Sequence, residues 1–363
     1  MNGHFATRLL ITTICTFSLA SSGCSLKEWH KNGFKVGPNY CKPVAEVAPD
    51  WIDAEDERIS PECTDGSNWW LVFDDPILNE LIVEAYDQNL SLREAGMRVL
   101  EARAQRGVTA GNLFPQSQSI DSSYSRNLLS RNTANTPPTV DRAFDNWATS
   151  GSLLWELDFW GRFRRAVEAA DADLDASVEN YDDVLTCLLA EVGATYVNIR
   201  TIQQRLQYAR DNIILQQGNL KIAQAQVLGG GVSEVDLRQA ELILADTRAS
   251  VPTLEAALRQ QNTLLCLLLG RPTENLIPAL GEGPIPTAPA AVAIGIPGDL
   301  LRRRPDVRRA ERQVAAQRAT IGVAVSDLYP HITSAGTIGW QAQTIGTQFG
   351  PNGNFGILTP GLS

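Results

Sequence analysis

EARAQRGVTAGNLFP (101–115) and RATIGVAVSDLYP (318–330) are two versions of one pattern, in which a helical sequence runs into an aromatic residue and a proline. The two stretches align at an offset of 215 positions (330 minus 115), with Phe114 opposite Tyr329. At that offset nine pairs agree: Arg93/Arg308, Ala95/Ala310, Val99/Val314, Arg103/Arg318, Ala104/Ala319, Gly107/Gly322, Val108/Val323, Leu113/Leu328 and Pro115/Pro330. The matches cluster at one helix-to-strand junction, so they indicate an internal duplication with a long period.

The hydrophobic period changes on passing each junction. Before Pro115 the apolar residues from about Pro76 to Ala110 recur at helical spacing, and after it the period is two. One set alternates at Trp147, Thr149, Gly151, Leu153 and Trp155, and a later set shares one face at Ile332, Ser334, Gly336, Ile338 and Trp340. Segments of about ten residues with weak alternation, Gly and terminal aromatics are typical of transmembrane barrel strands. A soluble edge hairpin has a similar pattern, so both alternatives stay open here.

The stretch 163–228 predicts one very long helix. It contains no proline, its two glycines are isolated, and apolar residues follow three-and-four spacing for most of its length. A helix of roughly 65 residues would be about 100 Å long. Ordinary globular helices end far sooner, so we expect a coiled-coil or tubular architecture.

GGGVSEVD (229–236) breaks this helix and starts a return helix, which must lie antiparallel to the first. Ser233 suits the N-cap and Asp236 completes a pair like that of a capping box. Pro252 should kink the return helix or cost it about 3 kcal/mol. Cys187 and Cys266 fall at similar heights, either as small residues in the seam or as a disulfide. The heptad positions are Leu237, Ala240, Leu244, Thr247, Val251, Leu254, Leu258, Gln261, Leu265 and Leu268.

The first residues, MNGHFATRLLITTICTFSLASSGC (1–24), have the pattern of an export signal, with an apolar run too short to be read as a membrane-spanning helix. The end of this segment, SSGC, resembles a bacterial lipobox, in which Cys24 becomes a lipidated N-terminus. Cleavage without lipid is the alternative. By the same resemblance, Ser25 would direct a lipoprotein to the outer membrane. Cys41 and Cys63 are a candidate disulfide in an oxidising compartment.

Composition excludes some classes of function. A net charge of -10 argues against a nucleic-acid partner, and we interpret the basic run 300–312 as the solvated start of a helix, with Pro305 and Asp306 in its first turn. No cysteine or histidine has metal-ligand spacing, and His30 and His331 lie in no catalytic pattern. The sequence contains no hydrolase elbow, P-loop or dinucleotide fingerprint, so we expect no enzyme activity, metal or cofactor.

Two strand hairpins per chain cannot close a barrel, and open strand edges are not tolerated in lipid. Several copies must therefore contribute strands to one shared barrel. Long helices enter directly from those strands, at WELDFWGRFRR (155–165) for example, and would continue the barrel as a tube. A membrane pore continued by a helical tunnel is a conduit.

Seven stretches in order along the chain resemble the TolC-type outer membrane factors, and specifically their lipid-anchored NodT-type branch. They are VGPNY (36–40), WWLVFDDPILNELI (69–82), LDFWGRFRRA (157–166), GGGVSEVD (229–236) with RQAE (238–241), LLGRP (268–272), GIPGDLLRRRPDVRRAE (295–311) and IGVAVSDLYP (321–330).

The resemblance implies a homotrimer with a single outer-membrane barrel, held in outer-membrane lipid, and a periplasmic helical channel. The channel would dock onto an inner-membrane pump through a periplasmic adaptor (membrane fusion) protein. By the same resemblance Gly231, Ser233 and Asp236 form the adaptor-contact tip. The alternative for Ser233 and Asp236 is that they serve only as a helix cap. Pro115, Trp155, Gly161 and Pro330 mark the helix-strand junctions.

The predicted fold is mostly α with a membrane β-barrel portion: a long antiparallel coiled-coil hairpin plus β-hairpins for a shared trimeric barrel. We divide the chain into a signal peptide (1–23), a lipid-anchored extended segment (24–68), a first repeat helix (69–114), a first barrel hairpin (115–160), a periplasmic helical hairpin (161–272), a connector (273–297), a second repeat helix (298–328) and a second barrel hairpin (329–363).

In the family the second repeat continues into a second helical hairpin, whereas this sequence stops at LTPGLS (358–363). We therefore expect a truncated reading frame or a fragment, with transport impaired. The predicted function is the outer-membrane channel of a tripartite efflux or export system, a passive conduit for small molecules. The alternative is a non-conducting periplasmic coiled-coil adaptor or scaffolding lipoprotein.

Overall fold

The structure, a computed structural model, describes residues 23–44, 46–48, 51–52, 55–56, 59–60, 66–130, 141–288, 292–293 and 297–363. The chain divides into two units. Unit 1 comprises residues 1–43, 100–176 and 310–363, and unit 2 comprises residues 44–99 and 177–309. Residues 1–22 of the predicted signal peptide (1–23) and Cys63 lie outside the described residues.

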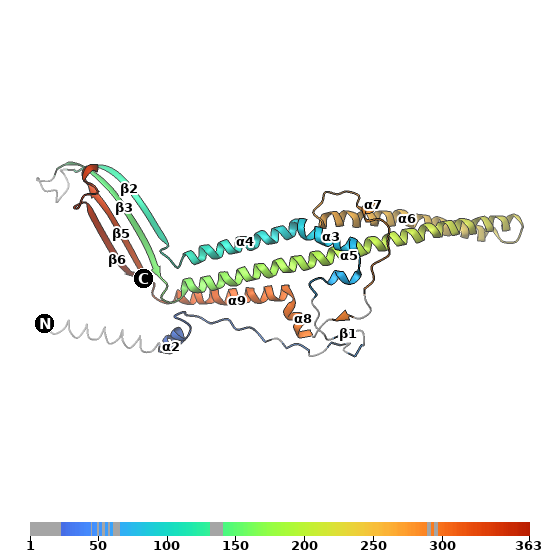
Figure 1. Cartoon of the computed structure of the whole chain (residues 1–363), viewed down its shortest axis with the longest axis horizontal. Helices are drawn as coiled ribbons and strands as arrows, with labels where there is room; N and C mark the ends of the chain where they lie inside the picture. Colours follow the sequence, from blue (N-terminus) through green and yellow to red (C-terminus); the bar gives the residue numbers. More distant parts are fainter. Residues whose placement is uncertain are drawn as a thin grey trace. The chain divides into compact units, whose positions relative to one another are not determined.

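Unit 1 contains a four-stranded antiparallel sheet in the order β2-β3-β5-β6 (Figure 1). Its strands are β2 (Ser117–Leu128), β3 (Ala143–Leu157), β5 (Ile332–Ala342) and β6 (Asn354–Leu362). The two hairpins are those expected after Pro115 and Pro330, and pairing between β3 and β5 joins them into one sheet. The outer strands β2 and β6 each keep one edge without a strand partner within the described chain.

Three helices connect to these strands: α4 (Leu90–Gly111) precedes β2, α5 (Arg162–Leu228) follows β3, and α9 (Pro305–Ser326) precedes β5. Within unit 1, α5 lies between the other two (Figure 1). On one side Arg106 of α4 pairs with Asp171 of α5 at 2.7 Å. On the other side Ala172 of α5 packs against Ala315 and Ala316 of α9. The helices therefore follow the order of the strands to which they are joined.

The N-terminal segment that we predicted to be extended begins instead with the helix α2 (Gly23–Lys31). The helix is stabilised by a tertiary contact, because Trp29 packs against Phe159 and Trp160, with ring centroids 5.1 and 5.7 Å away. Local sequence could not reveal a partner 130 residues along the chain. The following residues 36–40, with a bend at Gly37, form a strap that contacts Arg165 of α5 and Glu311 of α9.

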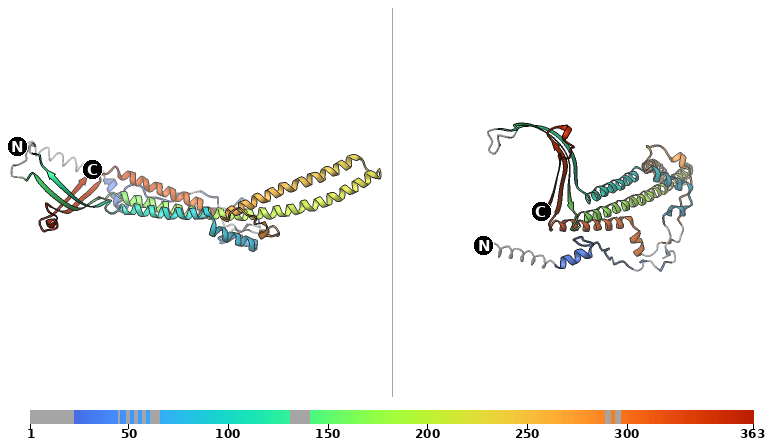
Figure 2. Two further views of the ribbon diagram at one scale, coloured as in Figure 1. Left: turned by 90° about the horizontal axis from the view of Figure 1, so that it is seen from above. Right: turned by 60° about the vertical axis from the view of Figure 1, so that its left-hand side comes forward.

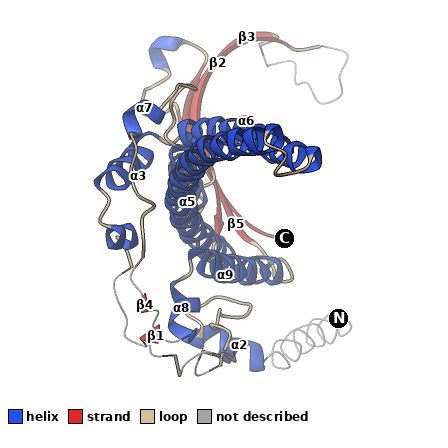
Figure 3. Ribbon diagram, turned by 90° about the vertical axis from the view of Figure 1, so that its right-hand side faces the viewer, coloured by secondary structure: helices blue, strands red, loops and turns tan. Residues whose placement is uncertain are grey.

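The hydrophobic core of unit 2 forms where α5 meets α3 (Pro76–Gln88), α6 (Glu234–Leu268) and α7 (Ile277–Leu280). Figure 3 looks along the helices and places α3 and α7 on one side of α5. The largest fully buried side chains in this core are Leu78, Ile82, Val192, Tyr196, Ile199, Leu265, Cys266 and Leu269. Their spacing of three and four on each helix gives each element one apolar face.

The first repeat helix, predicted as continuous over 69–114, is broken twice. It comprises a 3-10 turn η1 (Trp69–Phe73), then α3, then α4, with a break at Asn89. The Asn89 side chain accepts from the N–H of Leu92 at 2.9 Å, as an N-cap does, and donates to the carbonyl of Leu268 at 2.9 Å. The break therefore ties the start of α4 to the end of α6.

The long helical hairpin agrees with the sequence. Helix α5 runs without interruption to Leu228 and α6 returns beside it (Figure 2). Every predicted heptad position of α6 is buried or half-buried, and most of its other residues are exposed. Pro252 lies inside α6, which remains helical on both sides of it. Helix α5 ends in a Schellman motif: Gly230 has φ +72°, its N–H bonds Val227 O, and that of Gly231 bonds Gln226 O.

The second repeat helix is also broken, because α8 (Pro297–Arg303) ends where α9 begins at Pro305. Proline has no N–H and suits the first turn of a helix, and Arg304 pairs with Asp306 at 2.7 Å across the break. The connector contributes α7 and β4 (Val292–Ala293), which pairs in parallel with β1 (Ile59–Ser60), and a short 3-10 turn η2 (Ile345–Thr347) separates β5 from β6.

The basic run 300–312 is a helix start, as predicted, and several of its arginines are in ion pairs. Arg308 pairs with Glu179 at 2.7 Å and Arg309 with Asp183 at 3.3 Å. Cys187 and Cys266 form no disulfide with each other. Cys266 lies in the core and donates to the carbonyl of Glu274 at 3.4 Å, whereas Cys187 is exposed, so a shared position in the seam is also wrong. No helix in the described parts of the chain is long and apolar enough to cross a membrane.

Candidate membrane-facing sheet and helical tip

The register of the sheet separates its residues into two faces. Residues directly opposite each other in an antiparallel pair share a face. Trp147 pairs with Ala342, Gly151 with Ile338 and Trp155 with Ser334, so the two alternating sets predicted from the sequence lie on the same face. We call it the apolar face. Its large apolar members are Ile120, Tyr124, Leu128, Trp147, Leu153, Trp155, Leu157, Ile332, Ile338, Trp340, Leu358 and Leu362.

The apolar side chains on this face are exposed to an unusual degree. Ile120 is 87% exposed, Ile338 65% and Leu358 75%. Tyr124 and Trp147 lie on the half of the strands nearer the β2–β3 loop, with ring centroids 4.5 Å apart and ring planes tilted by 40°, whereas Trp155 lies near the opposite end of β3. Exposed apolar side chains with aromatic residues at both ends form a surface that suits a lipid environment.

The opposite face, the polar face, is rich in hydroxyl and amide groups. On β2 all of its members are polar, and Ser119 and Ser152 lie 2.8 Å apart across the β2–β3 pair. The polar members are Ser117, Ser119, Asp121, Ser123, Ser125, Asn127, Asn146, Ser150, Ser152, Glu156, Thr333, Thr337, Gln341 and Thr359. A sheet with these two faces is suited to separate lipid from water.

The predicted junction residues lie where strands meet helices. Pro115 stands between α4 and β2, and Gly161 has φ +84° directly before α5. Trp155 lies inside β3, two residues before its end, and its indole N–H donates to Leu113 O at 3.2 Å, which ties β3 to the end of α4. The carbonyl of Pro330 accepts from the Trp160 indole at 2.9 Å. The four residues therefore belong to one junction region.

A cluster of charged residues occupies the same end of the sheet. Glu156 on the polar face accepts from Arg162 at 3.1 Å and lies 2.8 Å from the Nδ1 atom of His331. Arg162 also pairs with Asp327 at 3.3 Å. Sequence reasoning did not identify this cluster, because its members come from two distant stretches of the sequence, 156–162 and 327–331.

A strap of residues 36–40 covers the contact between α5 and α9. Arg165 is only 2% exposed and donates to Val36 O at 3.0 Å and to Gly37 O at 2.9 Å. Arg165 also pairs with Glu168, which Lys35 contacts as well. Burial raises the pKa of Glu168, but hydrogen bonds from Lys35 and Arg165 outweigh it and lower the pKa below its ordinary value. The family-like VGPNY motif is therefore a structural clamp.

The turn between α5 and α6 carries the three predicted tip residues, Gly231, Ser233 and Asp236, all exposed. The Asp236 carboxylate accepts from the hydroxyl of Ser233 at 2.8 Å and from its backbone N–H at 3.0 Å. These hydrogen bonds lower the pKa of Asp236. Both residues therefore cap α6, and the exposed side chains of Leu228 and Val235 flank them with apolar surface.

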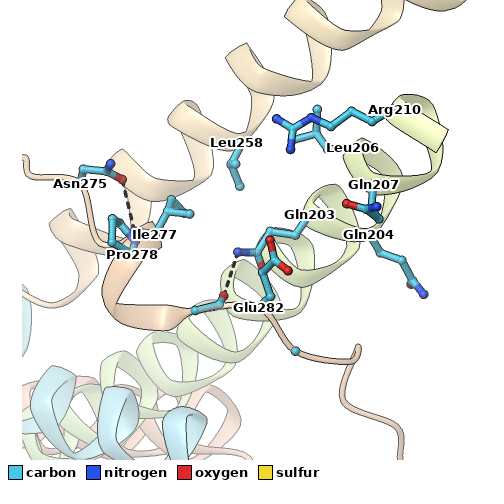
Figure 4. Close-up of a pocket in the computed structure, with 12 residues that line it drawn as sticks. Gln203, Gln204, Leu206, Gln207, Arg210, Leu258, Asn275, Ile277, Pro278 and Glu282 are labelled. Carbon is cyan, nitrogen blue, oxygen red and sulfur yellow. Dashed lines mark hydrogen bonds between the residues drawn. The ribbon is translucent and has the colours of Figure 1, made fainter. Parts of the chain in front are cut away.

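A cleft of about 510 Å³ lies between α5, α6 and the loop around Asn275 in unit 2 (Figure 4). Its polar side chains bond to nearby groups: Gln203 donates to Gly281 O at 3.1 Å and Gln207 to Asp211 at 3.1 Å. Two of the polar side chains that line the cleft are therefore already engaged within the protein.

Beside this cleft, the side chains of Asp75, Tyr196 and Arg200 form a hydrogen-bonded group that connects α3, α5 and α7. The Tyr196 hydroxyl donates to Asp75 at 2.7 Å, and Arg200 donates to that hydroxyl at 2.9 Å and to Leu280 O at 3.0 Å. Burial, followed by the hydrogen bond to Asp75, raises the pKa of Tyr196 to about 12. The hydroxyl therefore stays protonated, and the group links α3, α5 and α7.

A two-faced sheet continued by long paired helices is the fold of the TolC-like outer membrane channels. The solved structure of the outer-membrane channel OprN superposes with a TM-score of 0.80 at 32% identity, covering 90% of this chain and 72% of that one. A structure of CusC superposes with a TM-score of 0.72 at 25% identity, covering 90% and 72%.

Sequence comparisons agree. The family model described as outer membrane efflux protein matches residues 81–271, more than half of the chain. Nodulation protein T of Rhizobium leguminosarum bv. viciae is 32% identical over 90% of this chain and 67% of its own length. The toluene efflux pump outer membrane protein TtgF of Pseudomonas putida is 29% identical over 89% and 66%. The chain belongs to the outer membrane efflux protein family, and it spans about two thirds of the length of these curated relatives.

Proposed function

We propose that this chain is the outer-membrane channel component of a tripartite efflux or export system, and acts as a passive conduit for small molecules. The observation that carries the proposal is the four-stranded sheet, which has one apolar face, one polar face and two edges without strand partners among the described residues. Lipid tolerates no open strand edge, so β2 and β6 require further strands in the membrane.

Copies of the same chain are the simplest source of those strands. Edge β6 of one copy would pair with edge β2 of the next, which repeats one contact around a closed ring. Three copies would supply twelve strands (three times four), with the apolar face toward lipid and the polar face toward a water-filled interior. A homotrimer is also the assembly implied by the family resemblance. The proposed role as a passive conduit involves no chemical reaction.

The exposed turn of the helical hairpin is the proposed contact for a periplasmic adaptor, which would link the channel to an inner-membrane pump. Gly231, Ser233 and Asp236 present a polar turn flanked by Leu228 and Val235. Two variants separate recognition from capping: Asp236→Arg changes the charge and the cap together, whereas Glu234→Arg changes only the charge. Loss of adaptor crosslinking in both would support recognition, and unchanged crosslinking in Asp236→Arg would contradict it.

We also propose lipidation of Cys24, which the lipobox-like sequence supports. Cys24 lies near the start of α2, and Trp29 of this helix packs at the end of β3, where the bilayer surface would lie. A lipid on Cys24 would therefore enter the same membrane as the sheet. Mass spectrometry of the mature N-terminus tests this directly, and an unmodified Cys24 in the membrane-bound protein would contradict it.

Two measurements on native outer membranes test the channel. Extracted protein should migrate as a trimer before heating and as a single chain afterwards, and it should conduct ions in planar bilayers. Ile120→Arg on the apolar face should block membrane assembly, because a charge on the lipid face costs about 2–4 kcal/mol near mid-depth. Ser123→Arg, on the polar face of the same strand, should assemble normally.

The opposite results would favour the alternative, a non-conducting periplasmic scaffold built on the coiled-coil hairpin. A monomer released into solution when Cys24 is replaced, together with equal behaviour of Ile120→Arg and Ser123→Arg, would contradict the channel. The long exposed hairpin is the observation on which that alternative depends.

A further inference from the structure

The polar face of the sheet carries one carboxylate with no cationic partner among the described residues, that of Asp121. Within the four strands this face holds two ionisable residues, Asp121 and Glu156. Glu156 is paired with Arg162, and His331 also contacts it. The contact of Asp121 is a hydrogen bond accepted from the Ser119 hydroxyl at 2.7 Å. Asp121 therefore leaves a net negative charge on the polar face of each copy.

The position of Asp121 along the strand places this charge at mid-depth. Asp121 pairs with Ser150, the eighth of the fifteen residues of β3. Its neighbours on the polar face are hydroxyl side chains, including Ser119 and Ser123 on its own strand. The charged cluster at the helix end of the sheet sets the two carboxylates of Glu156 and Asp327 against the single positive charge of Arg162, so it does not offset Asp121.

From this placement we propose that Asp121 sets the charge selectivity of the conduit, so that cationic and neutral small molecules pass more readily than anions. The inference rests on the proposed function, because it requires the polar face to line a water-filled pore shared by several copies. Each copy then contributes one carboxylate at the same depth. Rings of acidic side chains concentrate cations and repel anions in a channel.

The expected size of the effect is set by screening. The Debye length is about 10 Å at ~0.1 M salt and about 3 Å at ~1 M. For three carboxylates on the wall of a wide pore, we expect a roughly two- to fivefold preference for K⁺ over Cl⁻ at ~0.1 M salt, which should vanish near ~1 M.

The test is the reversal potential of the full chain in planar bilayers under a KCl gradient. The unsubstituted chain should give a cation-selective potential at low salt. Asp121→Asn should move the potential toward zero, and Asp121→Lys should reverse its sign, with single-channel conductance at high salt unchanged in both.

Relocating the charge provides the matched control. Adding Ser123→Asp to Asp121→Asn returns a carboxylate to the same face two residues along and should restore the selectivity. Adding Ser123→Asn instead enlarges the same side chain without adding a charge and should not restore it. This pair of variants also separates a true charge effect from a general disturbance of β2.

The outcomes distinguish a failure of this inference from a failure of the proposed channel function. An unchanged reversal potential in Asp121→Asn, with conductance intact, overturns the role of Asp121 but does not contradict the proposed channel function. Restoration by Ser123→Asn would show that the selectivity does not depend on a carboxylate, and would overturn the electrostatic role of Asp121. If the unsubstituted chain gives no conductance, the proposed channel fails and this inference fails with it.

Discussion

The two copies of the repeat helix, α4 and α9, bury opposite faces although their sequences align. The buried residues of α9 are Ala315, Ala316, Ala319, Gly322 and Ser326, and their equivalents in α4, all exposed, are Leu100, Glu101, Ala104, Gly107 and Gly111. Conversely, Leu92 and Ala95 of α4 are buried, whereas their equivalents Val307 and Ala310 are exposed. Because α5 lies between the two helices, each copy meets it from the opposite side.

The difference shows that a repeated residue need not repeat its role. Gly322 is covered by Arg165, with no room for a side chain, whereas the equivalent Gly107 has open space around it. Each copy also leaves one face of its helix open. This open seam comprises Val307, Val314 and Ile321 on α9 and Leu328 two residues beyond its end. These four residues lie at seven-residue intervals and are from 40% to 82% exposed. Exposed apolar residues at this spacing are typical of a helix that packs against another helix.

The largest expected difference between the two sides of α5 concerns its arginine contacts. Arg165→Ala, on the α9 side, should lower the free energy of unfolding by about 3–5 kcal/mol, because it leaves the strap carbonyls and Glu168 without their buried partner. Arg106→Ala, on the α4 side, removes an ion pair that is nearly half exposed and should cost less than about 1 kcal/mol.

Guanidinium titration of the detergent-solubilised protein, followed by circular dichroism, measures both values. Equal losses of unfolding free energy in Arg165→Ala and Arg106→Ala would show that the strap contributes nothing to the α5–α9 contact. The two sides of α5 would then not differ in stability.

The duplicated glycines give the next largest effect. In Gly322→Ala the new Cβ would lie 2.9 Å from the Cγ, Cδ and Nε atoms of Arg165, which the strap holds in place, so we expect a loss of about 1–3 kcal/mol. Gly107→Ala should instead gain about 0.5–1 kcal/mol, since alanine is the better helix former and nothing lies within 4 Å. Changes of opposite sign in the free energy of unfolding, measured by the same titration, would confirm that the two glycines have different roles. Changes of the same sign would contradict it.

Much of the fold was predictable because it follows from local periodicity. The heptads of α6, the length of α5, the turn at Gly230 and the alternation of β3 and β5 are all set by residues close together in sequence. Even the shared face of Trp147 and Ile338 follows from period two once the strands pair. The capping by Ser233 and Asp236 is equally local.

The features that sequence reasoning missed depend on distant partners. Helix α4 is separated from α3 because the Asn89 side chain binds Leu268 O, 179 residues along the chain. Helix α2 depends on Phe159 and Trp160, and the clamp role of Arg165 depends on a strap about 130 residues earlier. No period or motif encodes such pairings. Asp121 was overlooked for a related reason, because its isolation is visible only after the whole polar face is assembled.

A smaller effect concerns pH and belongs to the strap side of α5 alone. The pKa of Glu168 is below its ordinary value, so the carboxylate stabilises the fold above the unfolded-state pKa, and this contribution is lost as pH falls through the folded-state pKa. The melting temperature of the unsubstituted chain should therefore decrease below about pH 4.5 more than that of Glu168→Gln. Asp171→Asn, on the α4 side, controls for loss of an exposed ion pair, and equal pH profiles for Glu168→Gln and the unsubstituted chain would contradict the role of Glu168.

The smallest effect on folding is expected at the open seam of α9. Substitutions there test directly whether α9 and α4 differ in what their outward faces contact. Val314 and Ile321 are 56% and 46% exposed, so Val314→Ser with Ile321→Ser should change the free energy of unfolding of the single chain by no more than about 0.5 kcal/mol. If the seam packs against a further helix in the assembled protein, the same double variant should dissociate at lower temperature when unheated and heated samples are compared by electrophoresis. At the equivalent positions in α4, Arg106 pairs with Asp171 of α5 and Val99 is half-buried, so Val99→Ser should instead act on the single chain. A double variant that assembles as stably as the unsubstituted protein would mean that the seam stays open to water, and that the two copies differ only in which face they bury.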